Sequence, residues 1–390
     1  MEEWKEYRLG DVCSQLSDGL HKAPKFKLGG DYIFVNAKNI SNGFIVDNDL
    51  TKKSTHEEYL KYSSPLDDTS ILYSIDGTIG NVALYRGEKV ILGKGACYLN
   101  PMPNILDRFF LYYELLSPRF KAYIDKMSTG STIKHISLKT MRNYSFVAPP
   151  LQQQRQIACI LSSIDNKITC NRQINDNLEQ QAQALFKSWL SHCSKMVTIG
   201  DLSLNITDYT KCEREEVVLI NSSDVTEGHF EHHILSENKN LKGHFKKRFQ
   251  KGDILYSQVR PRNRHWAFCT FDSDNYLAST QLMVIRNRPN VIPSILLYQY
   301  IIDDNVWLEF TLKTETRSGT FPQGNYEDLS SIRVPFGADT QSISASLERI
   351  YNLIYYNEDE SRHLAQLRDT LLPRLMSGEL KVNEIERTVG

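Results

Sequence analysis

The feature that most limits how this chain can fold is a heptad pattern near its middle. In residues 149–190, apolar side chains recur in alternating steps of four and three, and a few polar or small residues fill the remaining seam positions. This spacing is typical of a long helix that packs along one face against a partner helix, and at about 1.5 Å per residue such a helix would span about 60 Å. The predicted seam residues are Ile157, Leu161, Ile164, Ile168, Asn171, Leu178 and Leu185.

The same pattern returns in residues 342–376, near the C-terminus. Each seam position lies 186 residues after its counterpart in the first stretch, for example 343 − 157 = 186. Even the seam asparagine is repeated, and a polar seam residue fixes the register of a helix pair at some expense of stability. The chain therefore looks like a tandem duplication whose two long helices pack together. The second set of seam residues is Ile343, Leu347, Ile350, Ile354, Asn357, Leu364 and Leu371.

Shorter segments around the two long helices also repeat. Residues 70–74 and 253–257 share the string Ile-Leu-Tyr-Ser, and the helical pattern of residues 109–126 returns at residues 295–310. Mixed strand and helix signals of this kind predict an α/β (α+β) fold, with two globular domains of mixed sheets in a pseudo-two-fold tandem repeat. The expected domain boundaries are 1–148, 149–193, 194–336 and 337–390. Pro373 is expected to kink or end the second long helix, and Gly378 to stop it.

Composition narrows the class of protein. The 390 residues carry a formal net charge of −1, and no apolar run approaches the ~18 residues of a membrane helix. The seven cysteines are scattered without a CxxC pair, which favours free thiols in a reducing compartment, and no secretory signal is visible at the start. We therefore expect a cytoplasmic protein with no membrane association. The near-neutral charge argues against nucleic-acid binding by the whole surface but leaves a local basic patch open.

One loop of the second half has the chemistry of a base-reading segment. Arg260, Arg262, Asn263 and Arg264 follow a predicted strand at residues 254–257. Arginine and asparagine make bidentate contacts to guanine and adenine edges, so we expect this loop to contact DNA. Hydroxyl, amide and basic side chains elsewhere could contact phosphates or bases, although Lys22 and Lys25 are equally explained as ordinary surface charge. These further candidates are Lys22, Lys25, Thr129, Ser131, Thr132, Lys134, His135, Thr280, Gln281, Arg317, Ser318, Thr320 and Gln323.

Motifs of a catalytic or metal site are missing from the sequence. A DNA methyltransferase needs a glycine-rich cofactor loop and an Asn/Asp-Pro-Pro-aromatic string, whereas residues 148–151 supply only the two prolines. The segment 93–95 is too short for a phosphate-binding loop, and His232 and His233 lack partners with metal-ligand spacing. The duplicated architecture without such motifs indicates a binding scaffold rather than an enzyme.

Several strings resemble conserved regions of one protein family, the specificity subunits of type I restriction-modification systems. Residues 149–165 read Pro-Pro-Leu-Gln-x-Gln-x-x-Ile-Ala-x-Ile-Leu-x-x-Ile-Asp and residues 184–189 read Ala-Leu-Phe-Lys-Ser-Trp, like that family's central conserved region. Residues 370–380, Thr-Leu-Leu-Pro-Arg-Leu-Met-Ser-Gly-Glu-Leu, are similar to its C-terminal signature. Trp4 with Leu-Gly-Asp-Val at 9–12 resembles the opening of a target recognition domain. The resemblance extends over the whole chain.

This resemblance implies a division of labour. Each globular part would be a target recognition domain that reads one half of a bipartite site in double-stranded DNA, and the long helices would form an antiparallel coiled coil that sets the spacer. Two modification subunits would dock on the helices and carry the S-adenosylmethionine chemistry on adenine N6, so no cofactor is expected in this chain. Restriction subunits would join for cleavage, and the specificity subunit itself would be non-catalytic.

Two other functions remain open from the residues alone. One is a fused restriction or methylation enzyme with its own active site, which the missing motifs argue against. The other is a coiled-coil adaptor that reads no DNA, which the near-neutral charge keeps open. Site-specific modification that depends on the arginine loop would distinguish a DNA reader from an adaptor.

Overall fold

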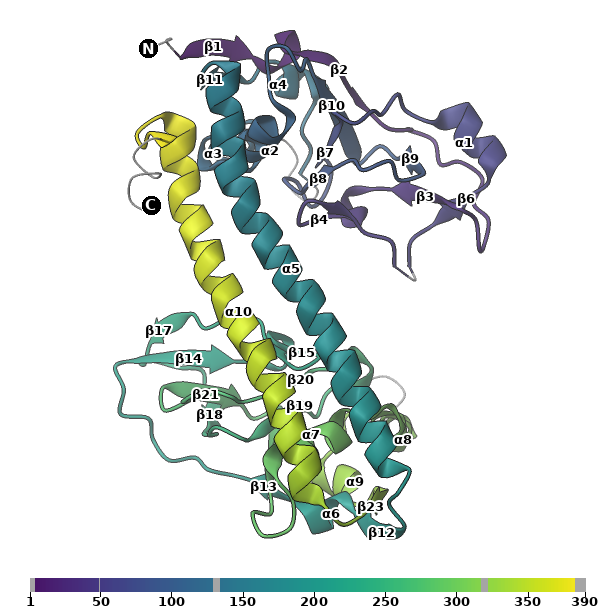
Figure 1. Ribbon diagram of the computed structural model, residues 1–390, viewed down its shortest axis with the longest axis vertical. Coiled ribbons are helices and arrows are strands. Elements are labelled where there is room, and N and C mark those ends of the chain that lie inside the picture. The colour runs from purple at the N-terminus through teal and green to yellow at the C-terminus, as the bar shows by residue number, and fades with distance from the viewer. Residues whose placement is uncertain (1–3, 49, 129–133, 317–321, 383–390) are drawn as a thin grey trace. The chain divides into compact units, whose positions relative to one another are not determined.

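The computed structural model describes residues 4–48, 50–128, 134–316 and 322–382. The chain divides into two compact units: Met1–Cys170 with Glu360–Gly390 forms the first, and Asn171–Asp359 forms the second. Each unit combines one globular part, which we call its globe, with one half of each long helix (Figure 1). The predicted mixed α and β content is confirmed.

The globe of the first unit is built on two small sheets. The main sheet is antiparallel in the order β2-β10-β7-β8, and the second sheet has the order β6-β3-β9 with β3 and β9 parallel. A short pair, β1 with β11, brings the start of the chain to the entrance of the first long helix. The strands are β1 (Lys5–Arg8), β2 (Cys13–Asp18), β3 (Tyr32–Val35), β4 (Ile40–Ser41), β5 (Phe44–Ile45), β6 (Lys53–Ser54), β7 (Ile71–Ser74), β8 (Val82–Leu84), β9 (Val90–Leu92), β10 (Ala96–Pro101) and β11 (Ser145–Ala148).

The helical stretch predicted at residues 109–126 is two helices rather than one. Ser117 accepts a hydrogen bond from the Phe120 amide as an N-cap, and Pro118 occupies the first helical position, so the first helix ends and a second begins there. Phe110 and Phe120 from the two helices are fully buried in one core with Leu161 of the long helix. The helices of this globe are α1 (His56–Tyr62), α2 (Arg108–Leu116), α3 (Pro118–Met127) and α4 (Leu138–Arg142), with 3-10 turns η1 (Leu9–Asp11) and η2 (Ala37–Asn39).

The globe of the second unit repeats this plan. Its main sheet has the order β13-β22-β19-β20, and its second sheet has the order β17-β14-β21-β18 with β14 and β21 parallel. The strands are β12 (Lys195–Thr198), β13 (Ser203–Ile206), β14 (Glu216–Ile220), β15 (Val225–Thr226), β16 (His229–Phe230), β17 (Leu235–Glu237), β18 (Phe245–Lys247), β19 (Ile254–Ser257), β20 (Trp266–Phe268), β21 (Tyr276–Ser279), β22 (Leu282–Asn287) and β23 (Arg333–Phe336). The matching order of the main sheets and the matching parallel pair confirm the tandem repeat.

The helices of the second globe show the same break. The single pattern predicted at residues 295–310 is interrupted at Asp303, whose carboxylate accepts from the Asn305 amide and so caps a new helix. The helices are α6 (Ile199–Leu202), α7 (Ser294–Ile302), α8 (Asp304–Glu315) and α9 (Tyr326–Ser330), with 3-10 turns η3 (Ser222–Asp224) and η4 (Pro261–Asn263).

Helices α5 (Leu151–Leu190) and α10 (Thr340–Ser377) are the two predicted long helices. In each unit their halves run antiparallel: in the first, Lys167 pairs with Glu360 at 2.9 Å and Asp165 with Arg368 at 2.8 Å. Every predicted seam residue is buried or half-buried within its own unit. The seam merges with the globe core in both units, so each globe is packed on its own part of the coiled coil.

A buried asparagine layer crosses the seam in the second unit. The Asn171 side chain donates to the Asn357 carbonyl at 3.3 Å, and the Asn357 side chain donates to Asn175 Oδ1 at 2.8 Å. Asn175 in turn donates to the Ile354 carbonyl at 3.1 Å. Because these bonds form in only one alignment of the helices, the layer fixes the register, as the seam asparagines predicted.

The expectation that Pro373 could end the second long helix is wrong. Helix α10 continues through Pro373 to Ser377, because one lost backbone bond is offset by the burial of Leu372, Leu375 and Met376 in the first unit's core. The predicted stop at Gly378 is confirmed, since this residue has φ of +76° directly after the helix. Among the described residues, none of the helices combines the length and apolarity needed to traverse a lipid bilayer.

Candidate nucleic-acid interface

Three loops of the first globe meet beyond one end of its main sheet. They are the β7–β8 loop (residues 75–81), the β9–β10 loop (residues 93–95) and the segment 134–136, and we call them the three-loop cluster. The Ile75 amide donates to the Gly95 carbonyl at 3.0 Å, and the Gly77 amide donates to the Lys134 carbonyl at 3.1 Å. The His135 imidazole contacts the Asp76 carboxylate. Two predicted residues, Lys134 and His135, thus lie beside the β7–β8 loop, a proximity that could not be predicted from the sequence.

The second globe builds the same cluster from residues 258–265, 280–281 and 322–324. The Gln258 amide donates to the Gln281 carbonyl at 2.9 Å, and the Arg260 amide donates to the Pro322 carbonyl at 3.0 Å. Val259 and Gln323 form an isolated antiparallel bridge. Arg260, Gln281 and Gln323, predicted separately from the sequence, therefore belong to one surface.

The arginine loop of the second cluster has an unusual backbone. Arg260 and Arg264 flank the 3-10 turn η4, and both adopt left-handed conformations, with φ of 49° and 53°. Non-glycine residues in this region cost about 1 kcal/mol or more each and persist only where surrounding contacts hold them. Here Trp307 of α8 supplies one such contact, because its indole nitrogen donates to the carbonyl of buried Pro261 at 2.9 Å.

The guanidinium groups of Arg262 and Arg264 are held by carboxylates of α8. Arg262 forms a two-point hydrogen bond with Glu315, with Nη2 at 2.8 Å from Oε2, and this bond lowers the pKa of Glu315. Arg264 pairs with Asp304 at 2.9 Å, and its guanidinium lies 4.1 Å from the centre of the Trp307 ring. The Arg262 side chain is still 69% exposed, whereas that of Arg264 is 31% exposed. Contact of either residue with DNA stays a prediction.

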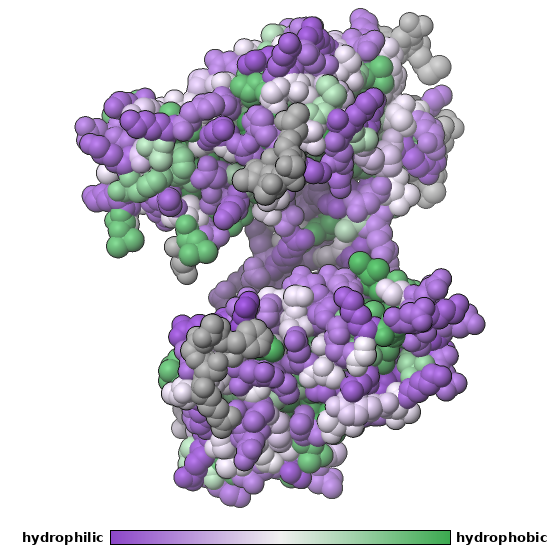
Figure 2. Space-filling view, turned by 180° about the vertical axis from the view of Figure 1, so that it is seen from behind, coloured by the Kyte–Doolittle hydropathy of each residue, from purple (hydrophilic) through white to green (hydrophobic). Residues whose placement is uncertain are grey.

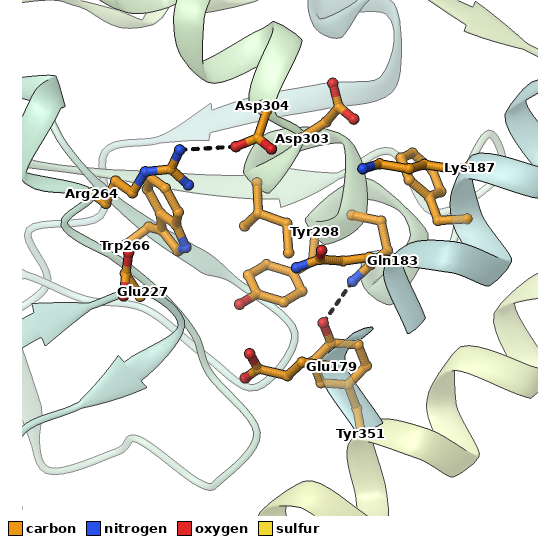
Figure 3. A pocket seen from close by; sticks show the side chains of 13 residues that line it. Glu179, Gln183, Lys187, Glu227, Arg264, Trp266, Tyr298, Asp303, Asp304 and Tyr351 are labelled. Atoms are coloured by element: carbon orange, nitrogen blue, oxygen red, sulfur yellow. Dashed lines mark hydrogen bonds and ion pairs between the residues drawn. The ribbon is translucent and has the colours of Figure 1, made fainter. Parts of the chain in front are cut away.

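Arg264 also lines a cavity of ≈ 400 Å³ in the second unit (Figure 3). Trp266 and Tyr298 come to this cavity from the globe, Glu179 and Lys187 from α5, and Tyr351 from α10. Charged groups of both signs face the cavity, and Gln299 closes one side by donating to the Tyr351 hydroxyl at 2.8 Å. The cavity therefore lies where the globe is fastened to its long helices.

The remaining predicted residues divide into three groups. Lys22, Lys25 and Asn263 are exposed, and the backbone amide of Lys25 donates to Glu58 at 2.8 Å. Thr280 belongs to the second cluster, and its amide donates to the His244 carbonyl at 2.9 Å, which connects the cluster to residue 244. A third group lies outside the described residues: Thr129, Ser131, Thr132, Arg317, Ser318 and Thr320.

Sequence reasoning missed Lys94 as a candidate. Lys94 is exposed at the tip of the β9–β10 loop, between buried Gly93 and Gly95. A side chain at Gly93 would come within 2.3 Å of Asn36 Oδ1 and 2.7 Å of Phe34, so only glycine lets this loop lie so close to the sheet. The Gly-Lys-Gly string was the available signal, but it was considered only as a phosphate-binding loop. Asp76, Gln258 and His244 carried no comparable signal.

The surface of both globes is mostly hydrophilic on the face seen in Figure 2, with scattered apolar side chains. No group of three or more His, Cys, Asp or Glu side chains suited to a metal ion occurs within the described part of the chain. Polar, amide and basic groups gathered on loops are suited to hydrogen bonding with phosphates and base edges.

Comparison with known proteins identifies relatives of the whole chain. The family described as "Type I restriction modification DNA specificity domain" matches residues 1–180. The HindI specificity subunit of Haemophilus influenzae is 35% identical over 182 residues, which cover 45% of this chain and 39% of that subunit. The MjaIX specificity subunit of Methanocaldococcus jannaschii is 20% identical over 426 aligned positions, which cover 98% of this chain and 95% of that subunit.

A solved structure shares the fold over nearly the full length. The type I restriction-modification S subunit from M. genitalium superposes with a TM-score of 0.57 at 18% identity and covers 96% of both chains. This agreement extends the likeness beyond residues 1–180 to the second globe and second long helix. Residues 1–180 therefore match the type I restriction modification DNA specificity domain, and over nearly its full length the chain is similar to specificity subunits of type I restriction-modification systems.

Proposed function

We propose that this chain reads a two-part sequence in double-stranded DNA, one half with each globe. The observation that carries the proposal is that each globe has a three-loop cluster. The two clusters lie at equivalent ends of two sheets with matching strand order, but they carry different side chains. A shared scaffold with divergent loops is the arrangement expected of two readers with different targets.

The two clusters offer different chemistry to DNA. The first presents Lys94 and Lys134 together with the contact between Asp76 and His135. The second presents Arg260 with the amides Gln281 and Gln323. Lysines supply phosphate contacts that position the protein, whereas arginine and glutamine make bidentate contacts to guanine and adenine. The first half-site would therefore depend more on backbone contacts than the second.

The coiled coil would set the spacer between the half-sites and carry the partner subunits. Two modification subunits would dock on the long helices and bring S-adenosylmethionine, and restriction subunits would join for cleavage. This chain would then need no cofactor of its own. The support is the pair of continuous helices α5 and α10, whose register is locked by the asparagine layer in the second unit.

Lengthening both long helices tests this function. One heptad inserted after Ile168 in α5 and one after Asn357 in α10 keeps the seam pattern intact. We expect methylated-adenine sequencing to show unchanged half-sites separated by a longer spacer. Altered half-sites would contradict the proposal, because neither globe changes in this variant. A methyl-transfer assay on the purified chain alone separates the reader from a fused enzyme: activity there would contradict the proposed non-catalytic role.

A substitution in the second cluster is the second test. Replacing Arg260 by Ala should change the second half-site and leave the first as it was. Weaker assembly with the modification subunits, with the same DNA sequence still modified at a lower level, would instead favour a coiled-coil adaptor.

A further inference from the structure

Two tight turns of the first globe each carry a leucine in full contact with solvent. Leu28 is 102% exposed and Leu50 is 91% exposed, and these are the most exposed large apolar side chains of the described residues. Together with Phe26, which is 40% exposed, they form what we call the leucine tip. Apolar side chains project from an otherwise polar surface on the face seen in Figure 2.

Both turns hold their leucines in a defined position. In the first, the Gly30 amide donates to the Lys27 carbonyl at 3.1 Å, and Gly29 has φ of +69°. A side chain at Gly29 would meet nothing within 4 Å, so glycine serves the turn geometry and leaves Leu28 at the apex.

The second turn is fastened by side chains as well as backbone. The Thr51 amide donates to the Asn48 carbonyl at 2.8 Å, and the Leu50 amide donates to Asn48 Oδ1 at 3.1 Å. Buried Asn39 then donates to the Thr51 hydroxyl at 3.1 Å. These hydrogen bonds hold the backbone next to Leu50, whose side chain is in contact with solvent.

The two turns are neighbours and adjoin the three-loop cluster. They line a common open hollow, and the Lys27 amide donates to the Lys53 carbonyl at 2.9 Å. Phe26 packs edge-on against Phe34 with 5.2 Å between ring centres, and Phe34 lies directly under Gly93 of the β9–β10 loop. The leucine tip and the β9–β10 loop are therefore attached to the same three-stranded sheet, β6-β3-β9, since Phe26 bridges to Ser54 of β6 and β9 leads into that loop.

Cations surround the leucine tip. Lys27 and Lys52 line the same hollow as the leucines and are exposed, and the Lys52 ammonium lies 4.9 Å from the centre of the Phe26 ring. Lys53 pairs with Asp47 at 2.7 Å, so its charge is neutralised within the globe. In a DNA duplex, apolar side chains of this kind can insert between neighbouring base pairs, and lysines beside them can contact the phosphates on either side.

We propose that Leu28 and Leu50 act as a wedge that inserts between base pairs beside the first half-site while the surrounding lysines hold the phosphates. This inference rests on the proposed function and adds a local distortion of the DNA to it. A wedge lets the first globe gain specificity from the deformability of a base step that it does not read by hydrogen bonds. A protein partner fits less well, because the apolar surface consists of separate apices rather than a continuous face.

The double variant Leu28→Ser with Leu50→Ser tests the wedge. The full chain would be assembled with its modification subunits and given a duplex bearing the site found by methylated-adenine sequencing, with 2-aminopurine placed step by step across the first half-site and its flank. We expect the wild-type complex to raise 2-aminopurine fluorescence at one step. The double variant should lose that signal and bind at least tenfold more weakly, because the apolar area of two leucines would no longer be buried between the bases.

Controls separate the wedge from general surface effects. Leu60→Ser removes another exposed leucine of the same globe, on α1, and should change neither signal nor affinity. Lys27→Gln with Lys52→Gln should lower the slope of log Kd against log salt by about one per lysine, whereas the leucine variant should leave that slope unchanged. The single variants Leu28→Ser and Leu50→Ser give the same readouts if the double variant folds poorly.

Two results would overturn the wedge. One is unstacking and affinity equal to wild type in the leucine variants. The other is normal DNA binding with weakened assembly of the modification subunits, which would make the tip a protein-docking surface. Failure of the wild-type complex itself to prefer its site over random duplex would instead refute the proposed function, so the two failures are distinguishable.

Discussion

The Tyr113 hydroxyl donates a 2.7 Å hydrogen bond to the Asp165 carboxylate, and so ties α2 of the first globe to α5. The second unit has the same tie between Gln299 of α7 and Tyr351 of α10, at 2.8 Å. Both partners are shifted by the duplication interval, since 299 − 113 = 186 and 351 − 165 = 186. The two repeats therefore have this contact at the same position, but it joins a hydroxyl to a carboxylate in the first unit and an amide to a hydroxyl in the second.

Removal of the Tyr113 hydroxyl tests how far this tie stabilises the first unit. Tyr113→Phe keeps the buried ring but leaves Asp165 with only its ion pair to Arg368 at 2.8 Å. Because a hydrogen bond to a charged group contributes about 1.5–3 kcal/mol, we expect the free energy of unfolding to fall by about that amount in urea denaturation. Tyr356→Phe, at a position that is 65% exposed, is the matched control and should have no measurable effect. Equal stability of the two variants would show that Arg368 alone satisfies Asp165.

His229 predicts a pH-dependent contact in the second unit. Its ring lies 2.7 Å from Glu358 of α10 and 3.7 Å from Glu179 of α5, and joins the β15–β16 hairpin to both long helices. The bond to Glu358 raises the pKa of His229, and burial raises the pKa of Glu179, with Asp176, Glu227 and Glu231 adding negative charge nearby. Both groups therefore bind protons more tightly in the folded state than in the unfolded one.

The sign follows from proton linkage. A histidine with a raised folded pKa contributes stability below its ordinary pKa of about 6.5, and this contribution is lost as pH rises through the folded value. The raised pKa of Glu179 acts in the same direction. We expect the free energy of unfolding to fall as pH rises above about 6.5, and His229→Gln to flatten that fall. His192→Gln, which removes an exposed ring that contacts the Ser188 carbonyl, should keep the wild-type slope. An unchanged slope in His229→Gln would contradict this account.

The asparagine layer is expected to lower the stability of the seam relative to an apolar one while restricting the helices to one alignment. Asn357→Ala removes the donor to Asn175 and creates a cavity in the seam, so we expect a loss of about 1–3 kcal/mol in urea denaturation. Leucine at Asn171, Asn175 and Asn357 together should restore or exceed wild-type stability but permit shifted helix pairings. Cysteine pairs across the seam would detect those pairings as extra disulfide products. A triple variant with a single product would show that the apolar seam alone fixes the register. The exposed Asn177→Ala is the control, since its amide contacts only its own helix at Gln173 in the described structure.

Periodicity was sufficient to predict the long helices. Heptad spacing depends only on neighbours along one helix, so both helices and their seam asparagines were visible in the sequence. The breaks at Ser117–Pro118 and Asp303 had capping signals as well, but the apolar period continued across them and concealed the change of helix. A continuous apolar periodicity can thus hide the capping residues that separate two helices.

The make-up of the candidate interface could not be predicted in the same way. Residues 93–95 and 134–136 meet residues 75–81 only because of how the strands are ordered in the sheet, and nothing local encodes that meeting. The carboxylates that hold Arg262 and Arg264 lie 53 and 40 residues away on α8. Local composition showed that the arginines were present, but not that Arg262 and Arg264 form ion pairs with carboxylates of α8.

These engaged arginines lead to a prediction about the second half-site. The amide of Arg260 is bonded to Pro322 within the three-loop cluster, whereas the guanidinium of Arg262 is held by Glu315 outside it. If Arg260 makes the base contact, Arg260→Ala should lose about 1–3 kcal/mol of discrimination at one base pair. Arg262→Ala should lower this discrimination less, because the Arg262 guanidinium is already bonded to the Glu315 carboxylate in the absence of DNA.

Competition binding with duplexes varied one base pair at a time in the second half-site measures this difference, and the first half-site serves as the internal control. Trp307→Phe keeps the ring under Arg264 but removes the donor to Pro261, so it should loosen the left-handed turn and relax discrimination partway towards the Arg260→Ala value. Equal relaxation in Arg262→Ala and Arg260→Ala would mean that Arg262 leaves Glu315 when DNA binds. In that case Glu315→Gln should strengthen binding, because the carboxylate would be competing with DNA for the same guanidinium.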